Sequence, residues 1–261
     1  MLPPQFRVGA LLLDTSGVLY GLSFLVFALI TVPRLRRRQI DPAHLGWMSP
    51  LLIALSALCA VYAHALDHGG AAALGYWLYA PFVHPGSSFL GALFGGVSGL
   101  LLYCKLRHIS VRDFLDAAAP GILVAYAIGR VGCHLAGHTT CCGSPTESWI
   151  GVAYPYTLGS DVRVVPTALF EATLAGAGAA VVFRCRRHPF ACYLVLHGAE
   201  RFIIEFLRTN PRHLLGLTQA QWISAGMMVA SIAFLVAGPA LGRSHHAADR
   251  PTGSLREGIP G

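Results

Sequence analysis

Charged residues are scarce in this chain of 261 residues, since Asp, Glu, Lys and Arg together make up only 12% of it. Soluble globular proteins carry about 25% charged residues. The composition, which is 54% hydrophobic, therefore excludes a soluble domain and predicts an integral membrane protein. A cleavable signal peptide is not expected either, because the first apolar run is long, has no basic leader and ends in a cluster of arginines.

No basic nucleic-acid-binding domain is recognisable, although the formal net charge at pH 7 is +7. The arginines cluster in short segments between apolar runs, and no aromatic platform accompanies them. This pattern is typical of membrane orientation, so we expect no nucleic-acid partner. An internal repeat is lacking as well, which disfavours a transporter built from inverted repeats.

Hydropathy marks seven apolar segments that predict membrane-spanning helices. They cover residues 16–32, 48–65, 87–104, 117–136, 166–183, 189–207 and 219–241. Most of the 19 basic residues follow the first, third, fifth or seventh segment, which places that side and the C-terminus in the cytoplasm and the N-terminus outside. We therefore predict one all-α, polytopic membrane domain over residues 1–242. The polar tail, residues 243–261, is expected to be disordered.

Three of the seven cysteines are clustered with two histidines in the segment Cys133-His134-x3-His138-x2-Cys141-Cys142. These side chains are numerous enough for a tetrahedral metal site, but their spacing matches no zinc pattern. A disulfide is an alternative, because the loop faces the oxidising side of the membrane. Free thiols are the third and favoured interpretation. The other four cysteines are expected to act as small apolar residues.

Two arginines lie inside apolar segments, Arg130 in the fourth and Arg201 in the sixth. A guanidinium group keeps its charge, and its insertion at the bilayer centre costs roughly 2.5–3.5 kcal/mol on a lenient scale. Such residues usually face a polar cavity and bind an anionic group. These two arginines are therefore the strongest functional signal in the sequence.

Further ionisable residues share a helical face with Arg201. His197, Arg201, Glu205 and Arg208 are spaced at i, i+4, i+8 and i+11, which places all four on one stripe. Glu205 can pair with either arginine, so a purely structural ion network is one interpretation. Inside a membrane, however, ionisable groups favour a functional site.

A parallel stripe surrounds Arg130 and contains His134 and, if the helix continues, His138. Gly137 and neighbouring glycines permit a close approach of the backbone to a ligand or to another helix. Two stripes that each contain a buried arginine predict a cationic cavity for a phosphate group. Glu171, in the fifth segment, can neutralise an arginine or orient a histidine, and structural pairing is favoured for it.

Several motifs follow one another along the chain in a recognisable order. In chain order they are SFLGALFGG (88–96), GRVGCHLAG (129–137) with GSPT (143–146), PTALFE (166–171), RFIIEFLR (201–208) and QAQWISAGM (219–227). The set resembles the motifs of the prolipoprotein diacylglyceryl transferase family and covers roughly residues 16–240. The resemblance implies a protein with seven spans in the bacterial plasma (inner) membrane.

The resemblance also implies an activity and its substrates. A diacylglyceryl group passes from phosphatidylglycerol to the lipobox cysteine thiol of a preprolipoprotein, glycerol phosphate is released, and no metal or organic cofactor is required. On this hypothesis Arg130 and Arg201 hold the phosphate, and Glu171 and Glu205 orient them. Gly137 and Arg208 are further candidates for substrate binding. A histidine is expected to take the thiol proton, and His138 and His197 are the candidates that could substitute for the usual family positions.

The chain departs from the family pattern at several positions. Leu90 and Val165 stand where members of the family usually carry histidine, and Ala168 replaces a glutamine. Cys133 occupies the place of an asparagine, and His197 that of a tyrosine. The arginine and glutamate framework is thus retained, while the usual base positions are not. The alternatives are therefore a transferase with a different acceptor, a non-catalytic lipid- or anion-binding protein of the same fold, and a transporter.

Overall fold

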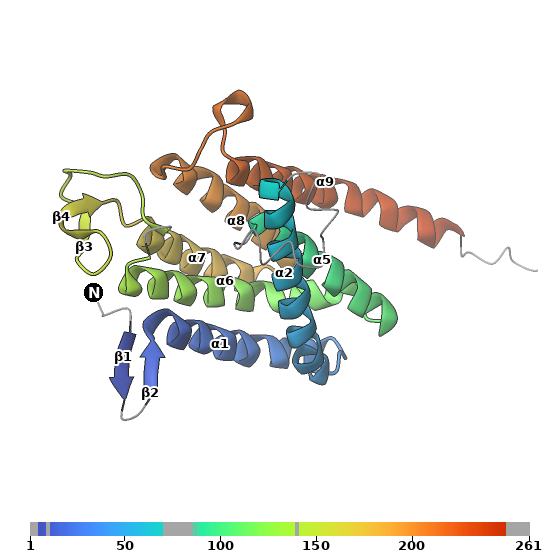
Figure 1. Ribbon diagram of the computed structural model, residues 1–261. Helices are drawn as coiled ribbons and strands as arrows, with labels where there is room; N and C mark the ends of the chain where they lie inside the picture. Colours follow the sequence, from blue (N-terminus) through green and yellow to red (C-terminus); the bar gives the residue numbers. More distant parts are fainter. Residues whose placement is uncertain (1–4, 9–10, 70–85, 87, 139–140, 249–261) are drawn as a thin grey trace, which may run out of the picture.

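The structure is a computed structural model that describes residues 5–8, 11–69, 86, 88–138 and 141–248. Helices make up most of this part of the chain (Figure 1). They are α1 (Thr15–Arg37), α2 (Ala43–Gly69), α5 (Phe89–Leu106), α6 (Val111–Ala136), α7 (Thr167–Arg184), α8 (Pro189–Ile204) and α9 (Gln219–Ala248). Each of them contains most of one predicted apolar segment, so the helical character inferred from hydropathy is confirmed.

Length and apolar composition allow five of the described helices, α1, α2, α5, α6 and α7, to cross a membrane. Helix α8 has only 16 residues, and α9 contributes a shorter apolar stretch, Gln219–Leu235. The coarser prediction, an all-α polytopic membrane protein, is therefore confirmed. The tail expected to be disordered lies mainly outside the described residues, and α9 extends into its first part as far as Ala248.

Helix α6 is the centre of the bundle, since it packs against α1, α7 and α8, and α9 lies against α8 (Figure 1). Small side chains permit close packing, because Ala119, Ala175 and Ala179 lie in the buried cluster between α6 and α7. Helices α2 and α5 form a further pair. A Cβ atom at Gly91 or Gly95 of α5 would clash with a backbone carbonyl oxygen of α2, so that contact requires glycine.

Two short antiparallel hairpins lie at one end of the bundle, on the left in Figure 1. They are formed by β1 (Gln5–Val8) with β2 (Leu11–Asp14), and by β3 (Val152–Tyr154) with β4 (Gly159–Val164). Neither is expected from the sequence, which predicts helices only. The Val165 amide donates to Ser144 O, and the Ser144 amide donates to Leu207 O at 2.9 Å. The loop after α6 is thereby joined to the start of α7 and to the end of α8.

Helix α6 ends at Gly137, whose left-handed backbone (φ 67°, ψ 38°) forms the C-cap. A Cβ atom at this position would lie 3.0 Å from the Tyr154 ring and 3.1 Å from Thr157 Oγ1. Thr157 Oγ1 also donates a hydrogen bond to the Gly137 carbonyl at 2.7 Å. Because the helix stops here, the stripe predicted on α6 does not extend to His138.

Candidate functional site

Glu171 of α7 is the centre of a buried group of ionised side chains. Its side chain is fully buried, with 0% of its surface exposed, and Arg130 Nε of α6 lies 2.6 Å from Glu171 Oε2. Arg201 of α8 donates through Nη1 to Glu171 Oε1. Arg208, which follows α8, places Nη1 3.5 Å from the same oxygen. One carboxylate thus contacts three guanidinium groups.

Glu205 provides a second carboxylate, in the 3-10 turn η2 (Glu205–Leu207) that directly follows α8. Arg201 Nη2 donates to Glu205 Oε2 at 3.1 Å, and Arg208 Nε lies 3.7 Å from that oxygen. Asn210 Nδ2 donates to Glu205 Oε1 at 2.6 Å. We call the following five residues the ionic cluster: Arg130, Glu171, Arg201, Glu205 and Arg208.

The ionic cluster contains three cations and two anions, so it carries one positive charge in excess. Both carboxylates are fully buried, and the three arginine side chains are 10–20% exposed. A buried charge is tolerated only where it is paired, so the two carboxylates explain how three arginines fit among apolar helices. The excess positive charge favours binding of an anion on the exposed side of the arginines.

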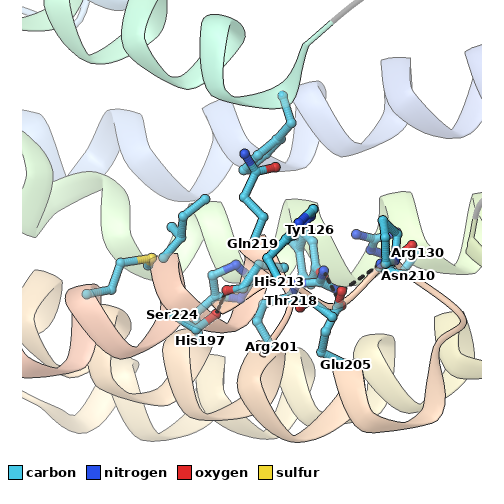
Figure 2. A pocket seen from close by; sticks show the side chains of 15 residues that line it. Tyr126, Arg130, His197, Arg201, Glu205, Asn210, His213, Thr218, Gln219 and Ser224 are labelled. Carbon is cyan, nitrogen blue, oxygen red and sulfur yellow. Dashed lines mark hydrogen bonds and ion pairs between the residues drawn. The ribbon is translucent and has the colours of Figure 1, made fainter. Parts of the chain in front are cut away.

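A cavity of about 430 Å³ adjoins the ionic cluster (Figure 2). Arg130 and Arg201, from separate helices, both line it, together with Glu205 and with α9 residues such as Ile223 and Met227. Its volume falls within the range of about 300–1,000 Å³ that is usual for small-molecule sites. Charged groups from the cluster and apolar groups from α9 therefore meet in one space, as an amphipathic ligand requires.

Tyr126 positions Arg130 at the wall of this cavity. The Arg130 guanidinium lies over the Tyr126 ring, with its carbon 4.8 Å from the ring centroid. The Tyr126 hydroxyl donates to Glu171 Oε2 at 3.2 Å, so ring and carboxylate hold the same arginine. Both Tyr126 and Arg130 also line a second cavity, of about 420 Å³, on the side of α6 that faces Tyr20 of α1.

Two cysteines of the predicted cluster lie beside this second cavity. Cys141 Sγ accepts a hydrogen bond from Arg130 Nη1 at 3.3 Å, and Cys133 Sγ lies 3.4 Å from the Tyr20 hydroxyl. Within the described ranges, no group of three His, Cys, Asp or Glu side chains is arranged to hold a metal ion. Cys133 and Cys142 are free thiols. Burial raises the pKa of the Cys142 thiol, so this side chain is protonated at neutral pH.

The structure separates the two histidines expected to accept a proton. His197 lines the 430 Å³ cavity and lies beside the arginines. His138 is exposed, and its Nε2 lies 2.5 Å from Ser16 Oγ of α1. His134 is directed to the Tyr154 hydroxyl at 2.9 Å. The turn at Gly137 explains this separation, because it carries His138 away from the face of α6 that bears Arg130.

Most residues predicted for the site are brought together, and several others join them. The arginines and Glu205 from the helical stripes meet Glu171 of the fifth segment in the ionic cluster, whereas Gly137 and His138 lie apart from the described lining of the 430 Å³ cavity. The sequence does not predict Asn210 or His213, which come from a loop without periodicity. Tyr126 precedes Arg130 by four residues, so helical spacing was a usable signal for it.

The comparisons with known proteins agree with these features. A family model described as prolipoprotein diacylglyceryl transferase matches residues 3–237. A phosphatidylglycerol–prolipoprotein diacylglyceryl transferase of Dehalococcoides mccartyi is 29% identical over 249 residues, which cover 90% of this chain and 92% of that protein.

Two further relatives of the same name match shorter parts of the chain. The protein from Clostridium tetani is 32% identical over 152 residues, which cover 54% of this chain and 60% of that protein. The protein from Streptococcus agalactiae serotype Ia is 32% identical over 164 residues, which cover 58% and 62%. The resemblance predicted from the ordered motifs is confirmed, and the chain belongs to the prolipoprotein diacylglyceryl transferase family.

Proposed function

We propose that this protein transfers a diacylglyceryl group from phosphatidylglycerol to the lipobox cysteine thiol of a preprolipoprotein, with release of glycerol phosphate. The observation that carries the proposal is the convergence of Arg130 and Arg201, from α6 and α8, on Glu171 and on one cavity. The names of the relatives support the same activity. The two substrates are the proposed partners, together with the surrounding bilayer.

The donor lipid suits the ionic cluster in charge and shape. A phosphodiester carries one negative charge, which matches the excess positive charge of the cluster. Guanidinium groups meet phosphate oxygens in a forked geometry, and Arg130 and Arg201 are partly exposed at the cavity. The apolar wall that α9 supplies through Ile223 and Met227 accommodates the glyceryl and acyl groups.

The cluster also suits the reaction. The thiolate sulfur of the acceptor bonds to the glyceryl carbon that carries the phosphate ester, and the carbon–oxygen bond to the phosphate breaks. The bonding pair leaves on the phosphate oxygen, so the charge of the phosphate group rises from one to two negative units. Fixed guanidinium groups stabilise charge that develops in this way, because they need no reorientation during the step.

The acceptor thiol must lose its proton before attack, because the thiolate is the nucleophile. His138 and His197 are the candidates that the sequence predicts for this role, and the structure places His197 on the cavity wall. The cluster residues act electrostatically, and Glu171 and Glu205 hold the arginines in place. Gly137 contributes indirectly, by ending α6 at its C-cap.

The membrane arrangement belongs to the same proposal. Seven spans, including the short α8 and the apolar stretch Gln219–Leu235 of α9, place the N-terminus outside and the C-terminus in the cytoplasm of a bacterial plasma membrane. Both hairpins lie at one end of the bundle, which supports placing the residues before α1 and the loop between α6 and α7 on the same side of the membrane (Figure 1). The polar residues 243–261 then form a tail on the cytoplasmic side, after a domain of residues 1–242.

A non-catalytic phospholipid-binding protein of the same fold is the second candidate. Leu90 and Val165 favour it, because they occupy positions at which the family usually carries histidine. This candidate predicts that phosphatidylglycerol binds in the cavity, but that no thioether forms.

Two measurements separate the candidates. The chain is expressed in bacteria depleted of their own transferase, and lipidation of a prolipoprotein is followed by its change in mobility on a gel. The purified protein is also mixed with phosphatidylglycerol and a lipobox peptide, and the peptide mass is measured. Restored lipidation and a peptide heavier by one diacylglyceryl group support transfer. Binding of the lipid without either change refutes transfer and favours the second candidate.

A further inference from the structure

His197 and Glu200 form a side-chain pair on α8, next to the ionic cluster. His197 Nδ1 lies 2.9 Å from Glu200 Oε2, and the two side chains are only 16% and 5% exposed. Their separation of three residues places both on one side of the helix. Because Glu200 engages Nδ1, Nε2 is the ring nitrogen left to exchange a proton.

Two tyrosine rings fix the orientation of the His197 imidazole. Tyr193 stacks against it, with ring centroids 5.5 Å apart and an interplanar angle of 11°. Tyr126 meets it edge to face at 4.8 Å and 80°. The same Tyr126 ring lies under the Arg130 guanidinium. The imidazole is thus held in a defined plane beside an arginine of the ionic cluster.

Glu200 places a buried carboxylate beside the His197 imidazole. Glu200 Oε1 is buried and has no hydrogen-bond partner within the described part of the chain. A buried carboxylate in this state is costly unless a cation lies next to it. The adjacent Arg201 pairs with Glu171 and Glu205. His197 therefore compensates the charge of Glu200 when it takes up a proton.

We propose that His197 and Glu200 form the proton-accepting dyad of the transfer, with His197 as the base and Glu200 as the residue that positions it. The inference rests on the proposed function and deepens it, by assigning the proton of the acceptor thiol to one site. The dyad also gives a physical account of three departures from the family pattern. Leu90 and Val165 cannot accept a proton, whereas His197 stands where the family usually carries tyrosine.

The step balances in protons and electrons. The acceptor thiol transfers its proton to His197 Nε2, and the resulting thiolate attacks the glyceryl carbon of the lipid. A carbon–sulfur bond forms while the carbon–oxygen bond to the phosphate breaks, and its electron pair remains on the phosphate oxygen. The imidazolium then returns the proton to the leaving phosphate or to water, and the dyad is restored. No oxidant or other co-reactant is needed.

Other titratable groups contact the dyad, line its cavity or belong to the ionic cluster, and they contribute to its pH dependence. They come from α6, from α7, from α8 with η2, and from the loop before α9: Tyr126, Arg130, Glu171, Tyr193, Arg201, Glu205 and His213. From α9 itself the cavity receives uncharged groups such as Gln219 and Ser224. Of these groups, His213 is the alternative proton acceptor that an experiment has to separate from His197.

The test compares His197→Gln and Glu200→Gln with the unaltered protein in lipid nanodiscs that contain phosphatidylglycerol. Initial rates of lipobox-peptide modification are measured from about pH 5 to 9, a range that spans the titration of histidine. His197→Gln is expected to lower kcat by about 100-fold or more and to remove the acidic limb of the profile. Glu200→Gln is expected to move that limb to lower pH, because the imidazolium loses its anion.

Matched variants show whether the effects are specific. His44→Gln removes another partly buried histidine that contacts a tyrosine, Tyr103, and Glu147→Gln neutralises an exposed glutamate. Both are expected to keep the rate and the profile of the unaltered protein. Glu200→Asp retains the carboxylate and is expected to return the acidic limb part of the way towards its position in the unaltered protein. Imidazole added to His197→Ala is expected to raise its rate, since the space between the two tyrosine rings is then vacant.

The outcomes distinguish the dyad from the function on which it rests. If the unaltered protein modifies no peptide, the proposed function fails. If it is active, and His197→Gln keeps both rate and profile while still binding phosphatidylglycerol, the dyad is refuted. Loss of the acidic limb in His213→Gln instead of His197→Gln overturns it equally. A change in KM or in melting temperature alone, with an unmoved profile, assigns Glu200 a purely structural role and contradicts the proposal.

Discussion

Neutralising Glu171, the central carboxylate of the ionic cluster, should destabilise the protein, and phosphatidylglycerol should offset part of this loss. In Glu171→Gln an amide replaces a fully buried carboxylate that contacts Arg130, Arg201 and Arg208. The amide NH₂ group is itself a donor, so it cannot accept from all of them. The cluster then holds three cations against Glu205 alone, and its excess positive charge rises from one to two.

The expected magnitude follows from the loss of one partner of a buried ion pair. Such a loss costs about 3–5 kcal/mol, because the remaining charge stays buried without compensation. For a domain of this size, 1 kcal/mol corresponds to about 2–4 °C, so the melting temperature should fall by about 10 °C. Transfer activity should fall as well, since Arg130 and Arg201 lose the carboxylate that aligns them.

The assay is thermal unfolding of the purified protein in nanodiscs, with phosphatidylglycerol or with phosphatidylcholine as the lipid. An anionic phosphate supplies part of the missing negative charge. The stabilisation by phosphatidylglycerol should therefore be larger in Glu171→Gln than in the unaltered protein. Glu147→Gln is the matched control, because Glu147 is exposed. An unchanged melting temperature in Glu171→Gln, or equal stabilisation by both lipids, would refute the reasoning.

Three further predictions concern the cluster and its surroundings. Arg130→Ala and Arg201→Ala should each abolish peptide modification while membrane insertion persists. The control Arg107→Gln, at an exposed arginine, should keep the rate. Full activity of both alanine variants would refute the binding of the phosphate group by these two arginines. Gly137→Ala should cost about 1–2 kcal/mol of unfolding free energy, because alanine is strained at this left-handed C-cap, and an unchanged melting temperature would contradict this. Cys142 should react with a maleimide more slowly at about pH 8 than an ordinary thiol does, since its pKa is raised, and peptide mass spectrometry measures the rate.

Much of the fold could be predicted from the sequence, because long apolar runs have few alternatives inside a membrane. Backbone groups in lipid must be satisfied internally, so such runs become helices. The two hairpins were missed because their strands have six residues or fewer and carry no sustained alternation of polar and apolar residues. Helix α8 is shorter than predicted because its last turn changes to the 3-10 geometry of η2.

The site was predictable where it depends on helical periodicity. Spacing of four residues placed Arg201 and Glu205 on one stripe, and the structure records their ion pair at 3.1 Å. Periodicity cannot show where a helix stops, and the left-handed turn at Gly137 removed His138 from the stripe. It also cannot place Asn210, because this residue lies in a loop whose path depends on tertiary contacts.

Arg130 and Tyr126 form a partition shared by the two cavities, on the α9 side and on the α1 side of α6. A molecule that reorients this guanidinium from one compartment alters the free energy of occupation in the other. Linkage makes the influence mutual and equal in size. For a ligand that moves the Arg130 side chain, an affinity determined in one compartment therefore applies only at a stated occupancy of its neighbour.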